Sequence, residues 1–139
     1  MDEPLIFHHI GIACRDIEKS KSFYLGLGYT ASQTMEDPLQ RVRVCFLEKS
    51  GAPRVELLEP VGSQSPVTRI LSTSGVTPYH MCYEVANLEH AIAQLRTGRG
   101  FLLVSSPVAA CAMDGRRVAF LFQKDTGLIE LVESTLVAE

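Results

Sequence analysis

The chain has 139 residues, a length typical of a single domain. Apolar residues make up 46% of it and charged residues 21%, which excludes a disordered chain and a coiled coil. The formal net charge of −3 argues against nucleic acid as a bulk partner, because phosphate binding needs clustered positive charge. No apolar run approaches about 20 residues, so we expect no membrane span.

The N-terminus and the cysteines indicate an intracellular protein. The first residues, MDEPLIFHH, lack the basic segment and apolar stretch of a secretory signal. The four cysteines are isolated in apolar segments and form no CxxC pair, so we expect reduced, buried thiols. The sequence therefore predicts a cytoplasmic protein without disulfides.

The first half of the chain predicts a strand, a helix and three further strands. Asp16 is a good helix N-cap, and apolar residues follow it at mostly helical spacing. Strands are expected at 5–14, 29–35, 41–48 and 54–59, and the helix at 17–27. This first module spans about 5–61, and a linker rich in Pro and Gly, with a short helix VTRILS, follows at about 62–77.

The second half repeats that order over about 78–134. Asn87 takes the place of Asp16 as helix N-cap. A helix is expected at 88–97, and strands at 79–85, 101–104, 116–123 and 128–133. A βαβββ module of this size buries too little apolar surface to be stable alone. We therefore expect residues 1–139 to form one domain of the α+β class, in which two tandem βαβββ modules share a core.

A histidine followed by a glutamate recurs in these modules at almost the same spacing. His9 and Glu56 lie in the first and last expected strands of the first module, and His80 and Glu130 lie in the corresponding strands of the second. Two neutral imidazoles and two carboxylates hold a divalent ion with zero net charge. The repeat therefore predicts a metal site that both modules contribute to, in a groove of a curved mixed sheet.

Four segments carry a resemblance to a known family: HHIGIACRDIEKSKSFY, VELLEPVGSQSPVTRIL, YHMCYEV and KDTGLIELVE. They resemble the vicinal oxygen chelate (glyoxalase/bleomycin resistance/dioxygenase) superfamily, and within it the methylmalonyl-CoA epimerase family. The resemblance covers nearly the whole chain. It implies that the two His–Glu pairs hold one divalent ion, with Zn, Co, Ni, Fe and Mn all compatible with this donor set.

The resemblance also implies an activity. A metal-dependent epimerase or isomerase would remove the α-proton of a 2-substituted acyl thioester such as methylmalonyl-CoA, while the metal stabilises the enolate. Glu130 is one candidate proton-transfer group. Some epimerases carry another carboxylate in the strand that here reads RVRVCF; this chain has Arg43 and Val44 there, and the nearest acid is Glu48. Glu48 is therefore the second candidate.

Two arginines are candidates for binding the substrate. Arg43 lies in the strand at 41–48, and Arg117 is one of two adjacent arginines that point to opposite faces of their strand. The simpler interpretation is that both are solvated surface residues. The functional one is a clamp for a carboxylate, thioester or phosphate group, because arginine makes bidentate contacts with such groups.

Other interpretations stay open. A glyoxalase I-like lyase would use the same donors, but the Asp-Pro-x-Gly turn of that enzyme is absent, since the sequence reads KDTG at 124–127. A small-molecule (drug) binding member of the fold would lack the metal set. A ring-cleaving dioxygenase would leave Glu56 without a role. Open sheet edges and the resembling family both favour a homodimer.

Overall fold

The computed structural model describes residues 2–135 of the chain. Within these residues it contains nine strands and three α-helices, arranged in two compact units. The first unit is His9–Tyr79. The second unit combines the chain up to His8 with the chain from His80 onward.

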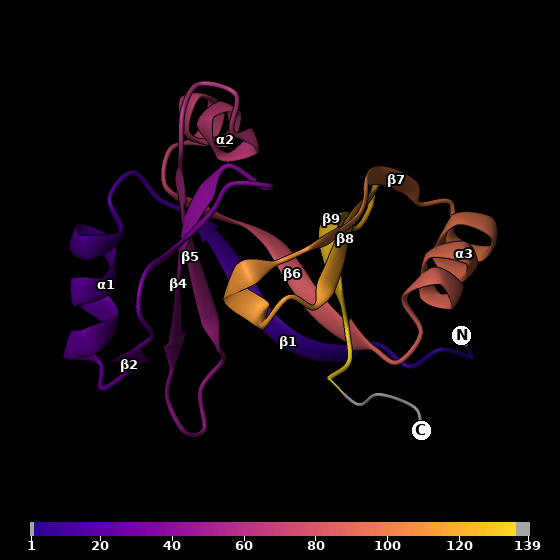
Figure 1. Cartoon of the computed structure of the whole chain (residues 1–139), viewed down its shortest axis with the longest axis horizontal. Helices are drawn as coiled ribbons and strands as arrows, with labels where there is room; N and C mark the ends of the chain where they lie inside the picture. The colour runs from indigo at the N-terminus through magenta and orange to yellow at the C-terminus, as the bar shows by residue number, and fades with distance from the viewer. Residues whose placement is uncertain (1, 136–139) are drawn as a thin grey trace. The chain divides into compact units, whose positions relative to one another are not determined.

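The first unit contains a mixed half-sheet in the order β2-β4-β5-β1, with β3 paired to β4. Strands β1 and β5 are parallel, and the other pairings are antiparallel. Figure 1 shows α1 beside β2 and β4, and α2 near β5. The elements are β1 (Ile6–Ala13, shared with the second unit), α1 (Ile17–Gly26), β2 (Thr30–Ala31), β3 (Met35–Asp37), β4 (Val42–Glu48), β5 (Val55–Pro60) and α2 (Pro66–Ser74).

Helix α1 covers one face of this half-sheet. Asp16 caps it, because the carboxylate accepts a hydrogen bond from the Lys19 backbone amide at 3.3 Å. The Ile17 amide donates to Glu59 Oε1 on β5 at 2.9 Å, which ties the first turn to the sheet. The core beneath the helix consists of Ile12, Cys14, Ile17, Cys45, Leu47, Val55 and Leu57.

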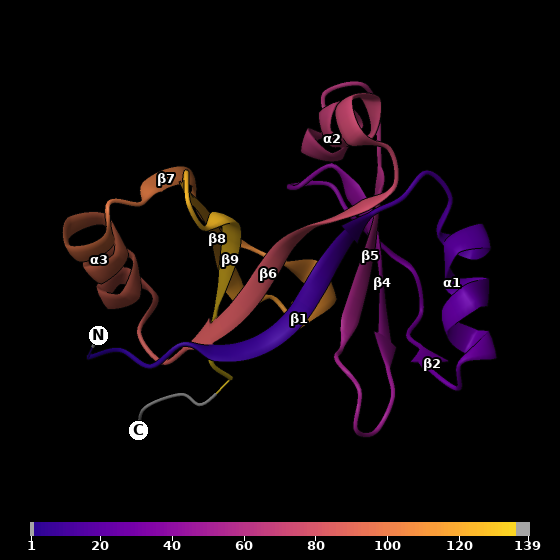
Figure 2. The same ribbon diagram turned by 180° about the vertical axis from the view of Figure 1, so that it is seen from behind.

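The second unit repeats the arrangement in the order β6-β9-β8-β7, with β6 and β9 parallel. Figure 2 shows α3 on the side of β7, β8 and β9. The elements are β6 (Thr77–Val85, whose first residues belong to the first unit), α3 (Leu88–Arg99), β7 (Leu102–Ala109), the 3-10 turn Cys111–Met113, β8 (Arg117–Gln123) and β9 (Gly127–Glu133).

Helix α3 is defined at both ends by its caps. The Asn87 side chain accepts from the His90 amide at 3.0 Å. Gly100 ends the helix in the left-handed conformation (φ 71°), which glycine adopts without a steric penalty. The core beneath the helix consists of Val85, Leu88, Ala91, Ile92, Leu95, Phe101, Ala119, Leu121, Ile129 and Leu131.

The predicted α+β class with two βαβββ modules is confirmed, and two of the predicted strands differ markedly from those in the structure. The expected strand at 29–35 is two short strands, β2 and β3. The expected strand at 101–104 continues to Ala109 as β7, with two register shifts against β8. This segment contains Pro107, which reads as a loop in sequence but is tolerated in a strand at the edge of a sheet.

None of the four cysteines forms a disulfide; Cys14, Cys45 and Cys82 are buried as expected, whereas Cys111 is partly exposed. Burial raises the pKa of the Cys14 thiol to about 11, so it stays protonated at neutral pH. Among the described residues, no helix is long and apolar enough to cross a bilayer. The cytoplasmic location and the single domain stay predictions.

Candidate functional site

The first unit buries a His–Glu pair on the face of its half-sheet that points away from α1. Parallel pairing of β1 with β5 sets Gly11 opposite Glu56, so His9 lies two residues along on the same face. His9 Nε2 and Glu56 Oε1 are 3.0 Å apart. The two side chains are only 0% and 5% exposed.

The second unit buries an equivalent pair. Parallel pairing of β6 with β9 sets Cys82 opposite Glu130, and His80 lies two residues along on that face. His80 Nε2 and Glu130 Oε1 are 3.2 Å apart, and the two side chains are 0% and 3% exposed. Each unit thus uses the same parallel register to bring an imidazole nitrogen to a carboxylate oxygen.

A phenylalanine packs edge-on against each histidine. Phe46 on β4 is the cross-strand partner of Glu56, and its ring centre lies 5.2 Å from that of His9. In the second unit Phe120 is the partner of Glu130 and lies 5.2 Å from His80. Sequence reasoning missed both residues, although each precedes the glutamate of its pair by the same interval. Edge-on packing of each ring against the imidazole limits the rotation of the imidazole.

The donor set fits a divalent ion. His9, Glu56, His80 and Glu130 are all buried and offer the atoms that could hold a metal. Two ligand atoms about 2.0–2.2 Å from one ion, at about 90–110° to each other, stand roughly 2.8–3.6 Å apart. The separations inside the two pairs, 3.0 Å and 3.2 Å, fall in that range. Buried carboxylates also need a positive partner, which a metal supplies.

Comparison with known proteins places this arrangement in a family. The sequence-family model of the glyoxalase/bleomycin resistance protein/dioxygenase superfamily matches residues 8–120, which is most of the chain. The chain belongs to this superfamily. The resemblance read from the sequence segments is therefore confirmed.

Relatives of this superfamily member include methylmalonyl-CoA epimerases. The mitochondrial enzyme of Mus musculus is 34% identical over 131 residues, covering 91% of this chain and 72% of the relative. The ethylmalonyl-CoA/methylmalonyl-CoA epimerase of Cereibacter sphaeroides is 30% identical, covering 89% and 94%. A Streptomyces coelicolor methylmalonyl-CoA epimerase variant, in complex with 2-nitronate-propionyl-CoA, has a TM-score of 0.81 and 30% identity, covering 96% and 100%.

Arg43 lies on the other face of its strand from the His9–Glu56 pair. Its cross-strand partner on β5 is Glu59, while Phe46 opposes Glu56. Alternate residues of a strand point to opposite faces, so Arg43 shares the α1 side with Cys45. The guanidinium pairs with Glu59 at 3.0 Å. This carboxylate is also the one that accepts from the first turn of α1.

Arg117 has the equivalent position in the second unit. It lies on the α3 side of β8 with Ala119, whereas Phe120 opposes Glu130. Its guanidinium contacts Glu89 on α3 at 2.7 Å and Glu133 on β9 at 3.0 Å. Arg117 therefore ties α3 to its sheet directly, whereas Arg43 pairs with the carboxylate that accepts from the first turn of α1. The prediction that they bind substrate gains no support from this placement, and we leave them out of the proposed site.

Glu48, the second predicted proton-transfer group, lies at the end of β4 next to the β4–β5 hairpin. Its side chain is 60% exposed and pairs with Arg54 across the hairpin, at 2.6 Å between carboxylate and guanidinium. Proton transfer requires the carboxylate to approach the reacting carbon. The contact with Arg54 holds Glu48 on the solvent-facing hairpin, so its catalytic role stays a prediction without structural support.

We expect the Arg117→Met variant to lose stability in a pH-dependent way. Hydrogen bonds from Arg117 lower the pKa of Glu89 and of Glu133 in the folded protein. Stability from a lowered carboxyl pKa is present above the unfolded value and is lost as pH falls through the folded value. The variant should therefore be less stable than wild type at pH 7, with the difference shrinking below about pH 4.5.

Urea denaturation at pH 7, 5 and 3.5 measures this difference. The matched control is Lys124→Met, which removes a positive charge from the exposed β8–β9 turn. A stability difference for Arg117→Met that stays constant across the three pH values would contradict the assignment of Arg117 to this network.

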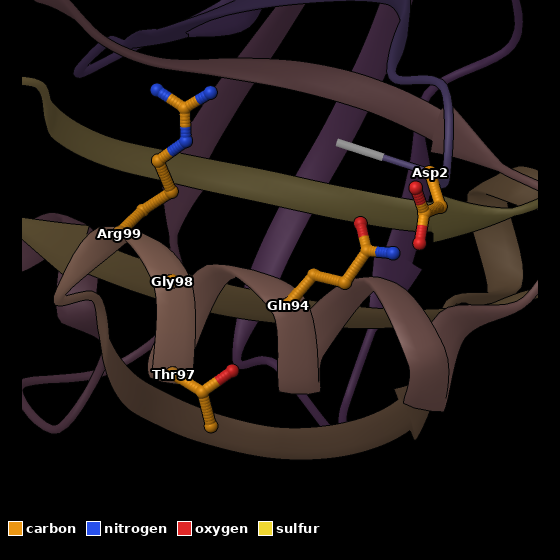
Figure 3. Close-up of a pocket in the computed structure, with 5 residues that line it drawn as sticks. All are labelled: Asp2, Gln94, Thr97, Gly98 and Arg99. Atoms are coloured by element: carbon orange, nitrogen blue, oxygen red, sulfur yellow. The ribbon is translucent and has the colours of Figure 1, made fainter.

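The open pocket drawn in Figure 3 lies elsewhere in the second unit. Figure 3 shows side chains from α3 and from the N-terminal segment around it. Its volume is about 280 Å³, and it is lined by Asp2, Gln94, Thr97, Gly98 and Arg99. None of these residues belongs to the His–Glu pairs or to the other predicted site residues, so the pocket does not enter the proposed chemistry.

Proposed function

We propose that the protein is an epimerase that inverts the α-carbon of a 2-substituted acyl thioester such as methylmalonyl-CoA. The observation that carries the proposal is the pair of equivalent buried His–Glu sets, each with its phenylalanine. The methylmalonyl-CoA epimerases among the relatives support the substrate class, as does the acyl-CoA analogue in the Streptomyces coelicolor complex.

We further propose that His9, Glu56, His80 and Glu130 together hold one divalent ion. The matching register and similar donor separations of the two His–Glu pairs support this proposal. The bound ion would act as a Lewis acid toward the thioester oxygen as negative charge develops there.

The protein's own residues orient the substrate and move the proton. Glu130 directs Oε1 toward His80, and its carboxylate has a second oxygen with which to accept a proton from the α-carbon. Phe46 and Phe120 exclude water from the pairs, which strengthens electrostatic interactions there. Electrons of the broken C–H bond pass into the thioester carbonyl, and return of a proton to the other face completes the inversion.

The partner of this site is thus a small-molecule acyl thioester. The homodimer expected from open sheet edges stays a prediction. Strand β7 ends the half-sheet of the second unit with Leu102 and Val104 largely exposed, which is compatible with association along that edge.

Exchange of the substrate α-proton with solvent deuterium tests the proposal. Metal-loaded protein should incorporate deuterium into methylmalonyl-CoA in D2O, as followed by mass spectrometry. Chelation should lower the rate by at least about 100-fold, because charge stabilisation at an oxyanion contributes that much. A metal-loaded protein that exchanges neither methylmalonyl-CoA nor ethylmalonyl-CoA would show that the substrate class is wrong.

A further inference from the structure

The second unit carries an ion pair that the first unit lacks, on the same sheet face as its His–Glu pair. Glu84 on β6 and Arg116 just before β8 are joined by a contact of 2.7 Å. Their side chains are 30% and 15% exposed. Glu84 lies on the same face of β6 as His80, because alternate residues of a strand share a face. In the pairing with β9, Cys82 is opposite Glu130 and Glu84 is opposite Val132.

The positions of the first unit that correspond to Glu84 and Arg116 are occupied by apolar residues. By register, Ala13 corresponds to Glu84, since it opposes Leu58 on β5 as Glu84 opposes Val132 on β9. Val42 corresponds to Arg116. Both Ala13 and Val42 are buried, at 0% and 2% exposure. The fold therefore does not require a charged pair at these positions, and partial burial of two charges is costly unless they are held in good geometry.

Arg116 holds Glu84 in a fixed place. Besides the carboxylate, its guanidinium donates to the backbone oxygens of Met113 at 3.2 Å and Glu133 at 3.4 Å. These contacts anchor the arginine to the 3-10 turn and to the end of β9. A carboxylate oriented by an immobilised third group has the arrangement of a general base, in which geometry is set before the substrate arrives.

Inversion of an α-carbon needs a second proton-transfer group. One group removes the proton from one face, and another must deliver a proton to the opposite face. Same-face residues one pleat apart on neighbouring strands have backbone positions about 7–8 Å apart. Two glutamate side chains that rise from such positions can approach one tetrahedral carbon from different sides, with each carboxylate roughly 3 Å from it. Glu84 and Glu130 stand in this diagonal relation.

We propose that Glu84, oriented by Arg116, is the second acid–base residue of the epimerase, working against Glu130. This inference rests on the function proposed above. In one direction Glu130 takes the α-proton, the C–H electron pair enters the thioester carbonyl to give the enolate, and protonated Glu84 returns a proton to the other face as the carbonyl re-forms. The reverse direction exchanges the two roles, and solvent exchange resets both carboxyl groups.

The Glu84→Gln variant tests this assignment with each epimer of methylmalonyl-CoA separately in D2O. The remaining group can still remove and return a proton on its own face. One epimer should therefore exchange within about threefold of the wild-type rate, without being inverted. The other epimer should lose exchange by roughly 100-fold or more, the usual contribution of a general acid or base. Glu18→Gln, on the exposed side of α1, is the matched control.

Several outcomes would overturn the assignment. An equal loss with both epimers, at unchanged metal content and urea midpoint, would make Glu84 a merely structural residue, and no loss would remove it from the site. The same asymmetry in Glu48→Gln but not in Glu84→Gln would transfer the role to Glu48. If Glu84→Gln does not fold, Glu84→Asp keeps the charge and should slow the same single epimer by about tenfold. Wild-type protein without exchange would instead refute the proposed function.

Discussion

The His80→Ala variant should lose stoichiometric metal binding, whereas wild-type protein should hold one divalent ion per chain. His80 is fully buried, and its Nε2 faces Glu130 Oε1 at 3.2 Å. Alanine offers no donor atom, and it also leaves a buried carboxylate facing an apolar side chain. Loss of one of four protein ligands weakens both the geometry and the charge balance of such a site.

Elemental analysis after metal loading and gel filtration measures the occupancy. His90→Ala is the matched control, because His90 lies exposed on α3 and contacts Gln94 rather than a ligand pair. We expect less than about 0.1 ion per chain in His80→Ala and full occupancy in the control. Full occupancy in His80→Ala, or no metal in wild-type protein, would refute the proposed metal centre independently of any activity.

The Leu131→Ala variant should show a large loss of stability. Leu131 lies on β9 with no exposed surface, in the core beneath α3. Truncation removes buried methyl groups and leaves a cavity, which costs about 2–5 kcal/mol in well-packed cores. Since small domains have a total stability of about 5–15 kcal/mol, this is a substantial share of the free energy of unfolding.

Urea denaturation at pH 7 compares Leu131→Ala with its counterpart in the first unit, Leu57→Ala. Leu57 is also fully buried, in the core beneath α1. We expect similar losses, and the same midpoint for both units when monitored by different probes, if they share one cooperative transition. Leu102→Ala is the control, because Leu102 is 67% exposed and should change stability by less than about 0.5 kcal/mol. A loss below about 1 kcal/mol in Leu131→Ala would contradict the described packing.

The two units differ in charge on the sheet face where chemistry is proposed. Each keeps its histidine, its glutamate, the phenylalanine beside the histidine, and an arginine paired with a glutamate of the last strand. On that face the second unit has the ion pair of Glu84 with Arg116, where the first unit has Ala13 and Val42.

The sequence by itself determined the modular architecture and the candidate ligand pairs. Helix starts at Asp16 and Asn87 were readable because capping is a local interaction between a side chain and an amide two or three residues on. His9 and Glu56 could be predicted as candidate ligands because strand alternation and the repeated His–Glu spacing both point to them. A polar residue that recurs in two apolar strands at equivalent places is a strong signal, even without knowledge of which strands are neighbours.

Only the tertiary structure decided which face each arginine and each remaining acid occupies. Alternation along one strand gives two faces but does not say which of them carries the helix. The sequence alone therefore could not decide whether Arg116 or Arg117 lies on the site face. Pairing of β8 with β9 resolves this, placing Arg117 on the α3 side and Arg116 beside Glu84. Glu48 and Glu84 differ for the same reason: contacts across strands and hairpins, set by long-range register, fix one carboxylate at the hairpin and the other on the site face.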